Sequence, residues 1–168
     1  MSVLVTDIIE TLELQPHPEG GYFRETYRSD EIIPQEALPS VFDGSRNYST
    51  SIYYLLQSGD FSAFHKIRQD EIWHFYLGSP VELYMISETG LLTKTIVGND
   101  VGNGQVPQFI VPKDYWFAAF VKEKNSYSLV GCTVAPGFDF RDFTMASRKA
   151  LIELFPKHQD IITRFTRH

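Results

Sequence analysis

The residues whose types and spacing best suit chemistry lie in two strand-like segments between Gly59 and Gly78. Side chains alternate between the two faces of an extended strand, so we expect His65 on one face of the first segment and Glu71 with Trp73 on one face of the second. If those faces meet inside a barrel, the carboxylate can orient the imidazole and raise its basicity, as a general base requires. The spacing therefore predicts a catalytic pair, His65 and Glu71, in a cavity lined by Trp73.

Two other interpretations of this pair stay open. An imidazole and a carboxylate are common ligands of transition metals, so His65 and Glu71 could belong to a metal site. They could equally form a buried, mutually satisfied polar contact without a chemical role. The neighbouring His74 has the opposite alternation to Glu71. We therefore expect His74 to face away from the cavity and to serve packing or an interface.

A series of short strand-like segments must position these side chains. Gly, Pro, Asn and Asp separate the segments at intervals of roughly ten residues, which indicates a sandwich or barrel. The segments span residues 22–28, 50–56, 61–67, 71–77, 81–87, 91–97, 108–111, 115–122 and 126–135. Residues 30–47 are expected to form a long loop, of the kind that often serves as a lid or an oligomer contact.

Helical patterns are confined to the two ends of the chain. Apolar residues recur at helical spacing within residues 2–14, and again over 146–155 and 158–167. Neither an internal repeat nor a linker divides the sequence. We therefore predict an all-β fold with short N- and C-terminal helices, forming one domain over residues 1–168.

The chain is rich in aromatic residues, with 13 Phe, 9 Tyr and 2 Trp among 168 residues. Such side chains favour strands and also line ligand pockets. Trp73 and Trp116 could therefore be core residues or could stack on a bound ring. Phe138 and Asp142 alternate onto one face after a Pro-Gly turn. There they could close one end of the barrel as part of an aromatic lid, or simply cover the core.

Composition and charge exclude several classes of protein. The formal net charge of −6 leaves no basic stripe to neutralise phosphates, which argues against binding to nucleic acid. The single cysteine, Cys132, excludes an internal disulfide and is typical of a reducing compartment. We find no signal peptide and no apolar run long enough to cross a membrane. The sequence thus predicts a cytoplasmic protein without a nucleic-acid or membrane partner.

The segment from Gly59 to Gly78 resembles the first motif of the cupins. In that motif, fixed spacings separate a glycine, two histidines, a glutamate and a second glycine. Both glycines, His65 and Glu71 match these spacings, whereas Ile67 stands at the position of the second histidine. The match therefore covers one of the two histidines of the motif.

The second cupin motif has a weaker counterpart in residues 112–117. Here Asp114 replaces the glycine and Phe117 replaces the histidine. Of the usual three histidines and one glutamate that bind the metal of cupins, only His65 and Glu71 remain. Two protein ligands rarely hold a transition metal against water. We therefore expect a site without a metal and without another cofactor.

Nearly the whole chain resembles the DUF985 or cupin-5 group, through LELQPHPEGGYFRETYRS, FHKIRQDEIWHFYLG and VAPGFDFRDF. The resemblance implies a double-stranded β-helix, or cupin jelly roll, and a homodimer. These cupins resemble in fold the metal-free epimerases of nucleotide-linked deoxyhexuloses. In those enzymes a barrel histidine removes a proton beside a ketone and a tyrosine is the opposing acid. Carried over, His65 is the base and either Tyr53 or Tyr76 is the acid.

The same resemblance gives a role to the segment HPEGGYFRE. It contains a second polar cluster, made of His17, Glu19, Arg24 and Glu25. A turn followed by a salt-bridged strand would explain the cluster, and a place at the pocket mouth is the alternative. On the second interpretation Arg24 and Glu25 bind substrate, and Arg24 is a candidate for contacting a diphosphate.

We therefore expect a small-molecule-binding cupin of unassigned activity, with a sugar-like or nucleotide-like ligand. The leading hypothesis is metal-free isomerase or epimerase chemistry at His65. One alternative is a non-catalytic binding module that senses or stores its ligand. Another is a metal-dependent cupin enzyme that uses His65 and Glu71 together with further ligands.

Overall fold

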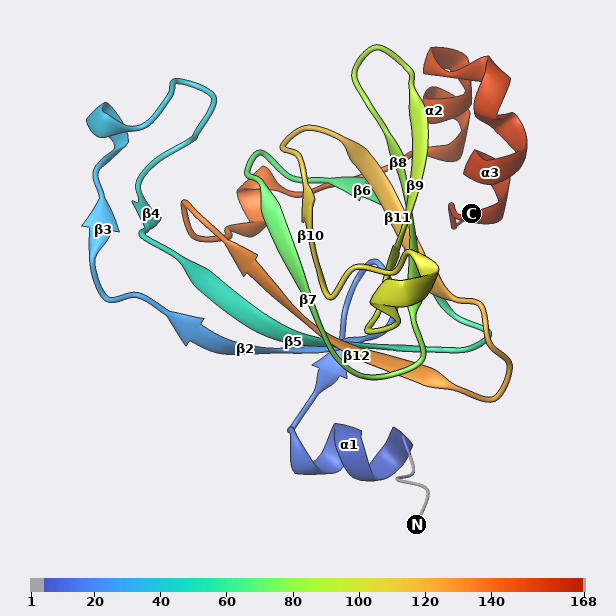
Figure 1. Ribbon diagram of the computed structural model, residues 1–168. Helices are drawn as coiled ribbons and strands as arrows, with labels where there is room; N and C mark the ends of the chain where they lie inside the picture. Colours follow the sequence, from blue (N-terminus) through green and yellow to red (C-terminus); the bar gives the residue numbers. More distant parts are fainter. Residues whose placement is uncertain (1–4, 168) are drawn as a thin grey trace.

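The computed structural model describes residues 5–167, which fold into two antiparallel sheets that face each other (Figure 1). The first sheet has the strand order β1 (Gln15–Pro16), β2 (Tyr22–Arg28), β5 (Thr50–Gln57), β12 (Tyr127–Val134), β7 (Glu71–Gly78) and β10 (Gln108–Val111). The second has the order β13 (Thr144–Met145), β6 (Phe61–Lys66), β11 (Trp116–Val121), β8 (Val81–Ile86) and β9 (Leu92–Val97). Each strand predicted from the sequence is present, and its ends agree within one residue.

The order of the strands along the chain defines the topology. Strands β5, β6, β7 and β8 alternate between the first and the second sheet, and β10, β11 and β12 do so again. This alternation is the winding of a double-stranded β-helix, or jelly roll. The fold class predicted from the sequence is therefore confirmed. Apolar side chains fill the space between the sheets, including the fully buried Leu83, Phe117 and Val130.

Short helices cover the outer faces of both sheets (Figure 1). Helix α1 (Val5–Thr11) lies on the first sheet, where Ile8 packs with Leu55 and Leu129. Helices α2 (Arg148–Leu154) and α3 (Gln159–Arg164), joined by the turn η4 (Pro156–His158), lie on the second sheet, where Leu151 and Ile162 pack with Phe64. The predicted terminal helices are thus present, although residues 2–4 of the first prediction lie outside the described residues. Within residues 5–167, no helix has the length and apolar character needed to cross a membrane.

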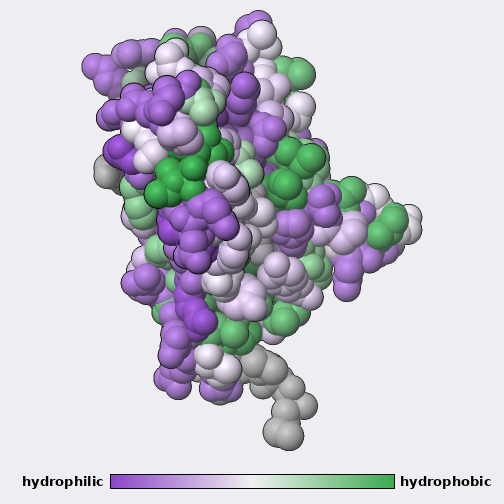
Figure 2. Space-filling view, turned by 90° about the vertical axis from the view of Figure 1, so that its left-hand side faces the viewer, coloured by the Kyte–Doolittle hydropathy of each residue, from purple (hydrophilic) through white to green (hydrophobic). Residues whose placement is uncertain are grey.

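The loop predicted over residues 30–47 contains a small hairpin of β3 (Ile32–Ile33) and β4 (Arg46–Asn47), with the turn η1 (Gln35–Ala37) between them. We call residues 29–47 the arm, because this segment extends from the two sheets on the left of Figure 1. Ile32 and Val41 of the arm are exposed. Figure 2 views the molecule from this side and shows hydrophobic patches interspersed with hydrophilic residues. Two further short turns are η2 (Val101–Asn103) and η3 (Phe140–Asp142).

Candidate functional site

A cavity of about 350 Å³ lies inside the barrel. Its walls come from inward-facing side chains of β2, β5, β6, β7 and β12, from the turn before β2 and from the segment after β12. The polar residues at its core are His17, Glu19, Tyr54, His65, Glu71 and Cys132. The aromatic residues around them are Phe23, Trp73, Phe138, Phe140 and Phe143. A concave site with mostly apolar walls and a few convergent polar groups is the usual form of a small-molecule pocket.

His65 is buried, and both of its ring nitrogens face acceptors. Its Nε2 lies 3.0 Å from Oε2 of Glu19, and its Nδ1 lies 2.8 Å from the backbone oxygen of Ala63. A carboxylate and a carbonyl only accept hydrogen bonds, so the imidazole must carry protons on both nitrogens to satisfy both contacts. Burial lowers the pKa of His65, but the charge and hydrogen bond of Glu19 outweigh burial and the pKa is raised. His65 is therefore held as an imidazolium.

Glu19 is the negative partner in this pair. Its Oε1 accepts a hydrogen bond of 2.8 Å from the hydroxyl of Ser62, and its Oε2 lies 3.4 Å from Nδ1 of His17. Burial raises the pKa of Glu19, but the charge and hydrogen bond of His65 outweigh it, with smaller help from His17 and Ser62, and bring the pKa to about 2. Glu19 is therefore ionised under all ordinary conditions.

The turn before β2 places Glu19 beside His65. Gly20 and Gly21 adopt φ values of +115° and +69°, which side chains other than glycine rarely tolerate. The chain passes so close to β6 that a Cβ on Gly20 would lie 2.3 Å from the backbone oxygen of Phe61. The hydroxyl of Tyr54 donates a 2.8 Å hydrogen bond to the oxygen of Gly20 and fixes the turn from inside the cavity. The paired glycines are therefore needed for the His65–Glu19 contact.

Glu71 reaches the same cavity from the start of β7. Its side chain is buried, and burial, together with the negative charge of Glu19, raises its pKa to about 7 although the positive charge of His65 opposes the shift. Hydrogen bonding from Cys132 and Trp73 lowers the pKa slightly. The indole Nε1 of Trp73 nevertheless has no hydrogen-bond partner of normal geometry among the described residues. Glu71 can thus gain or lose a proton near neutral pH, next to an indole N–H that lacks a full acceptor.

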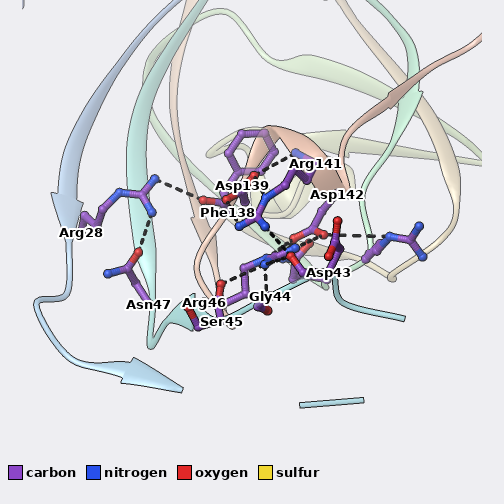
Figure 3. A network of polar contacts seen from close by, with 12 residues as sticks. Arg28, Asp43, Gly44, Ser45, Arg46, Asn47, Phe138, Asp139, Arg141 and Asp142 are labelled. Atoms are coloured by element: carbon purple, nitrogen blue, oxygen red, sulfur yellow. Dashed lines mark hydrogen bonds and ion pairs between the residues drawn. The ribbon is translucent and has the colours of Figure 1, made fainter. Parts of the chain in front are cut away.

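The mouth of the cavity carries an arginine whose charge is already paired. Arg28 donates two hydrogen bonds to the carboxylate of Glu25, at 2.7 and 2.9 Å. It also donates to Oδ1 of Asn47 at 2.8 Å and to the oxygen of Phe138 at 3.1 Å (Figure 3). A register shift in β2 between Glu25 and Tyr27 turns Arg28 toward the cavity, although strict alternation would give it the face opposite to Glu25.

The segment after β12 brings its aromatic residues to the mouth because a buried ion pair holds it. Asp142 accepts two hydrogen bonds of 2.7 Å from Arg46, and the side chains of both residues are only 1% exposed (Figure 3). Gln69 donates a further 2.7 Å hydrogen bond to Asp142. Arg46 also donates to the backbone oxygens of Asp43, Gly44 and Ser45. The arm and the aromatic segment are thereby tied together.

Five of the predicted site residues line the cavity: His65, Glu71, Glu25, Trp73 and Phe138. His74, as expected, points away and contacts Thr133 at 3.2 Å.

The two tyrosines expected to act as acids lie outside the cavity. Tyr53 packs beneath helix α1, and Tyr76 is half exposed with its ring 6.0 Å from that of Tyr53. Tyr54 takes the inward position instead. Alternation could not decide between Tyr53 and Tyr54, because each of the two faces of β5 carries a tyrosine followed by a leucine and is covered by other elements. Tyr76 lies on the same face of β7 as His74, opposite to Glu71, so alternation alone places it outside the cavity.

Three predicted substrate contacts are also placed elsewhere. Arg24 points outward and pairs with Glu13 at 2.8 Å. Trp116 faces the C-terminal helices, with the Lys66 ammonium 5.0 Å from its ring centre. Asp142 lies in the buried pair described above, because the turn η3 breaks the alternation assumed for residues 138–142. Sequence reasoning also did not assign Tyr54, Arg28 and Phe143 to the site.

The donor groups in the cavity do not fit a cupin-type metal. Both nitrogens of His65 are engaged by protein acceptors, and Ile67 and Phe117 offer no ligand atom. Within residues 5–167, no group of three or more His, Cys, Asp or Glu side chains has the arrangement needed to hold a metal ion. The described residues of the cavity therefore do not form a metal site of the cupin type.

A jelly roll with an interior cavity lined from both sheets and from the turn before β2 is the architecture of a cupin. The chain belongs to the Cupin_5 family of the cupin superfamily (DUF985), whose model matches residues 6–146. It is 34% identical to the uncharacterised protein YML079W of Saccharomyces cerevisiae over 146 residues, which cover 82% of this chain and 72% of the yeast protein.

Solved structures are similar over almost the full length. Protein SO0799 of Shewanella oneidensis is 40% identical, with a TM-score of 0.88 and 99% of each chain covered. A hypothetical protein of Leishmania major is 30% identical, with a TM-score of 0.90, covering 99% of this chain and 100% of that one. Oxalate decarboxylase of Bacillus subtilis, at 13% identity and a TM-score of 0.54 over 89% of this chain and 36% of its own, shares the fold alone.

Proposed function

We propose that the cavity binds a small molecule and that Glu71 exchanges a proton with it, as in an isomerase or epimerase. The observation that carries the proposal is a buried carboxyl with a pKa of about 7, in one cavity with the His65–Glu19 ion pair. General acid–base catalysis is most efficient when the pKa of the group lies near the working pH. Among the titratable side chains of this cavity, Glu71 meets that condition.

The proposed reaction uses the two groups in different roles. As a carboxylate, Glu71 removes a proton from a carbon next to a carbonyl; the C–H electron pair becomes a C=C bond, and the carbonyl π pair moves to oxygen. The positive charge of His65 stabilises the resulting enolate in a low-dielectric site. Return of the proton from the carboxyl of Glu71 to the same carbon restores the ketone, and it gives the epimer when the enolate has turned its other face toward Glu71. His65 itself is a poor base here, because both nitrogens already donate to protein acceptors.

Hydrogen exchange into keto-sugars in D₂O, followed by proton NMR, tests this function. We expect exchange with the wild type and a loss of about 100-fold or more in Glu71→Gln, which keeps the shape of the side chain but cannot carry the proton. Tyr76→Phe is the matched control, since Tyr76 lies outside the cavity, and it should retain the wild-type rate. Equal exchange in the wild type and in Glu71→Gln would contradict the proposal.

A non-catalytic binding module is the second candidate. It is favoured by the full engagement of the His65 ring, which makes the ion pair resemble a structural contact. On this interpretation Glu71 and Trp73 only hold the ligand. Saturable binding of a keto-sugar at the cavity, without any exchange of its hydrogens in D₂O, would favour this candidate over the first.

A further inference from the structure

The charges around the cavity mouth exclude a ligand that enters with a negative group. The two cations that line the cavity, Arg28 and His65, are each paired with a carboxylate, at 2.7 Å and 3.0 Å respectively. Burial lowers the pKa of His17, which favours its neutral form, and its Nδ1 already lies 3.4 Å from the carboxylate of Glu19. No cation among the described lining residues is therefore left to bind a phosphate or a carboxylate.

The cations near the barrel that could have served a diphosphate are directed elsewhere. Arg24 pairs with Glu13, Lys66 lies over the ring of Trp116, and Arg68 lies 3.9 Å from Asp142. The lining instead carries the carboxylates of Glu19, Glu25 and Asp139, together with Glu71. An anionic ligand would lose its hydration shell and lie next to these carboxylates without a cation to pair with.

The walls suit a flat or ring-shaped molecule. The rings of Phe138, Phe140 and Phe143 lie with centres 5.0 to 6.4 Å apart, and His17 stacks on Phe140 at 6.0 Å. Phe23 meets the ring of His17 edge-on at 4.6 Å. Such a set of aromatic faces and edges contacts a ring over a large area without requiring a charge.

The lining includes a donor whose nearby acceptor, the Glu71 carboxyl, lies outside normal hydrogen-bond geometry. Trp73 is only 1% exposed and lines the cavity, and its indole N–H has no hydrogen-bond partner of normal geometry within residues 5–167. A buried N–H without a partner is costly, so a ligand that supplies an acceptor there gains affinity. An indole nitrogen can only donate, which means that the ligand group at this point must be a carbonyl oxygen or a similar acceptor.

We infer that the cavity selects an uncharged ring compound that presents a carbonyl-type acceptor to the indole N–H of Trp73, and that it rejects the anionic analogue. The inference rests on the proposed function in taking this cavity as the binding site. It adds the class of the ligand, which would place a carbonyl beside Glu71. If the natural ligand carries a phosphate, that part lies outside the cavity.

Nicotinamide and nicotinate are a suitable probe pair, because they share one ring and differ mainly in an uncharged amide against a carboxylate. The two indole N–H signals of ¹⁵N-labelled protein report the binding, with Trp116 as an internal control outside the cavity. We expect nicotinamide to shift the Trp73 signal and leave that of Trp116 unchanged, with a dissociation constant at least about tenfold lower than that of nicotinate. Trp73→Phe assigns the signal.

A charge variant tests the exclusion of anions directly. Glu25→Gln removes the carboxylate that neutralises Arg28, so we expect nicotinate to bind at least about tenfold more tightly to this variant than to the wild type. Glu13→Gln, which unpairs the outward-facing Arg24 in the same way, is the matched control and should leave nicotinate binding unchanged. Both variants alter half-exposed or exposed ion pairs, so folding is expected to be preserved.

Three outcomes would overturn the inference: nicotinate binding as tightly as nicotinamide to the wild type, a nicotinamide shift at Trp116 instead of Trp73, or equal nicotinate binding by Glu25→Gln and Glu13→Gln. None of these measurements depends on turnover. Selective nicotinamide binding without hydrogen exchange into keto-sugars would support the ligand class while contradicting the proposed catalysis. Hydrogen exchange into keto-sugars without selective nicotinamide binding would support the proposed catalysis and contradict the ligand class.

Discussion

The cavity holds three side chains whose charges depend on pH: Glu19, His65 and Glu71. The pKa of Glu19 is lowered to about 2, that of His65 is raised, and that of Glu71 is raised to about 7. Glu19 is therefore ionised throughout the neutral range, and its charge favours the imidazolium form of His65. Glu71, with a pKa of about 7, gains or loses its proton within that range.

The pH dependence of stability should reveal this arrangement. Between its unfolded pKa of about 4.5 and its folded pKa of about 7, Glu71 binds more protons in the native state, so its contribution is present below pH 4.5 and is lost as pH rises through 7. The raised pKa of His65 also lowers stability as pH rises above 6.5. The lowered pKa of Glu19 has the opposite effect: it stabilises the fold above pH 4.5, and this contribution is lost as pH falls toward 2. The lowered pKa of His17 acts in the opposite direction to that of His65, because it lowers stability as pH falls below 6.5. Because the shift of Glu71 is larger than that of His17, we expect the wild type to be more stable at pH 5 than at pH 8.

Glu71→Gln should flatten this profile, since the amide does not titrate. Between pH 5 and pH 8, the free energy of unfolding should fall less in Glu71→Gln than in the wild type. The difference should be on the order of 3 kcal/mol, at roughly 1.4 kcal/mol per pKa unit. Urea unfolding at pH 5 and pH 8 measures it. Glu88→Gln, in an exposed turn, serves as the control and should behave as the wild type. An unchanged pH profile in Glu71→Gln would show that Glu71 does not titrate in this window.

At the scale of single elements, the turn before β2 is as important to the site as any strand. It carries Glu19, and it can approach β6 only because Gly20 has no side chain. Its signal in the sequence is the paired glycine, but nothing local indicates that the turn folds back on His65, which lies 46 positions beyond Glu19. Such long-range placement is why sequence reasoning located Glu19 only as a member of a polar cluster.

Gly20→Ala should therefore disturb the site, and Gly59→Ala is the matched control. Both glycines have positive φ, but a Cβ on Gly20 would meet backbone at 2.3 Å whereas one on Gly59 would meet nothing within 4 Å. We expect Gly20→Ala to cost at least about 1 kcal/mol more in the free energy of unfolding. The His65 ring signals should also shift in NMR spectra of Gly20→Ala alone. If both substitutions lowered the free energy of unfolding equally, the strain of the positive φ would explain the loss, and the close approach of Gly20 to β6 would not contribute.

The buried pair of Arg46 and Asp142 ties the arm to the aromatic segment. Asp142→Asn leaves the guanidinium of Arg46 buried without its counter-charge, a change that typically costs about 3–5 kcal/mol. We expect that loss in urea unfolding, together with faster amide exchange over residues 138–143. Asp139→Asn breaks an exposed pair in the same segment and should have a much smaller effect. Slow exchange over residues 138–143 in Asp142→Asn would show that the pair does not hold the segment.

At the scale of the whole molecule, the local sequence pattern predicts where the strands lie but does not predict which strands pair in the sheets. Alternation and turn residues determine where β5 to β12 begin and end, because these signals lie within a few residues of each strand. The pairing of β12 with β5 and β7 joins residues that lie 50 or more positions apart in the sequence, and no local signal records it. Wherever both faces of a strand are covered, as in β5 and β11, alternation also cannot tell inside from outside. Alternation therefore does not separate Tyr53 and Trp116 from residues that face the cavity.

We propose that the arm mediates the homodimer that the family resemblance implies. Its exposed Ile32 and Val41, with the neighbouring exposed Tyr27 and Tyr48, are apolar side chains of the kind that partner surfaces cover. We expect a dimer in sedimentation velocity and a shift to monomer in Ile32→Glu. Leu154→Glu, at an equally exposed apolar residue of helix α2, should leave the dimer intact. A monomeric wild type, or dissociation caused by Leu154→Glu alone, would contradict this prediction.

The position of β12 between β5 and β7 also constrains how the protein is made. During synthesis, β5 and β7 leave the ribosome well before residues 127–134, so each must wait with an unpaired edge for the strand that joins them. Unpaired strand edges are where nascent chains associate wrongly. The cavity, which takes Cys132 from β12, is completed only when this strand inserts. A nascent chain therefore completes the cavity late in translation, and a molecule that binds there can assist only the final step of folding.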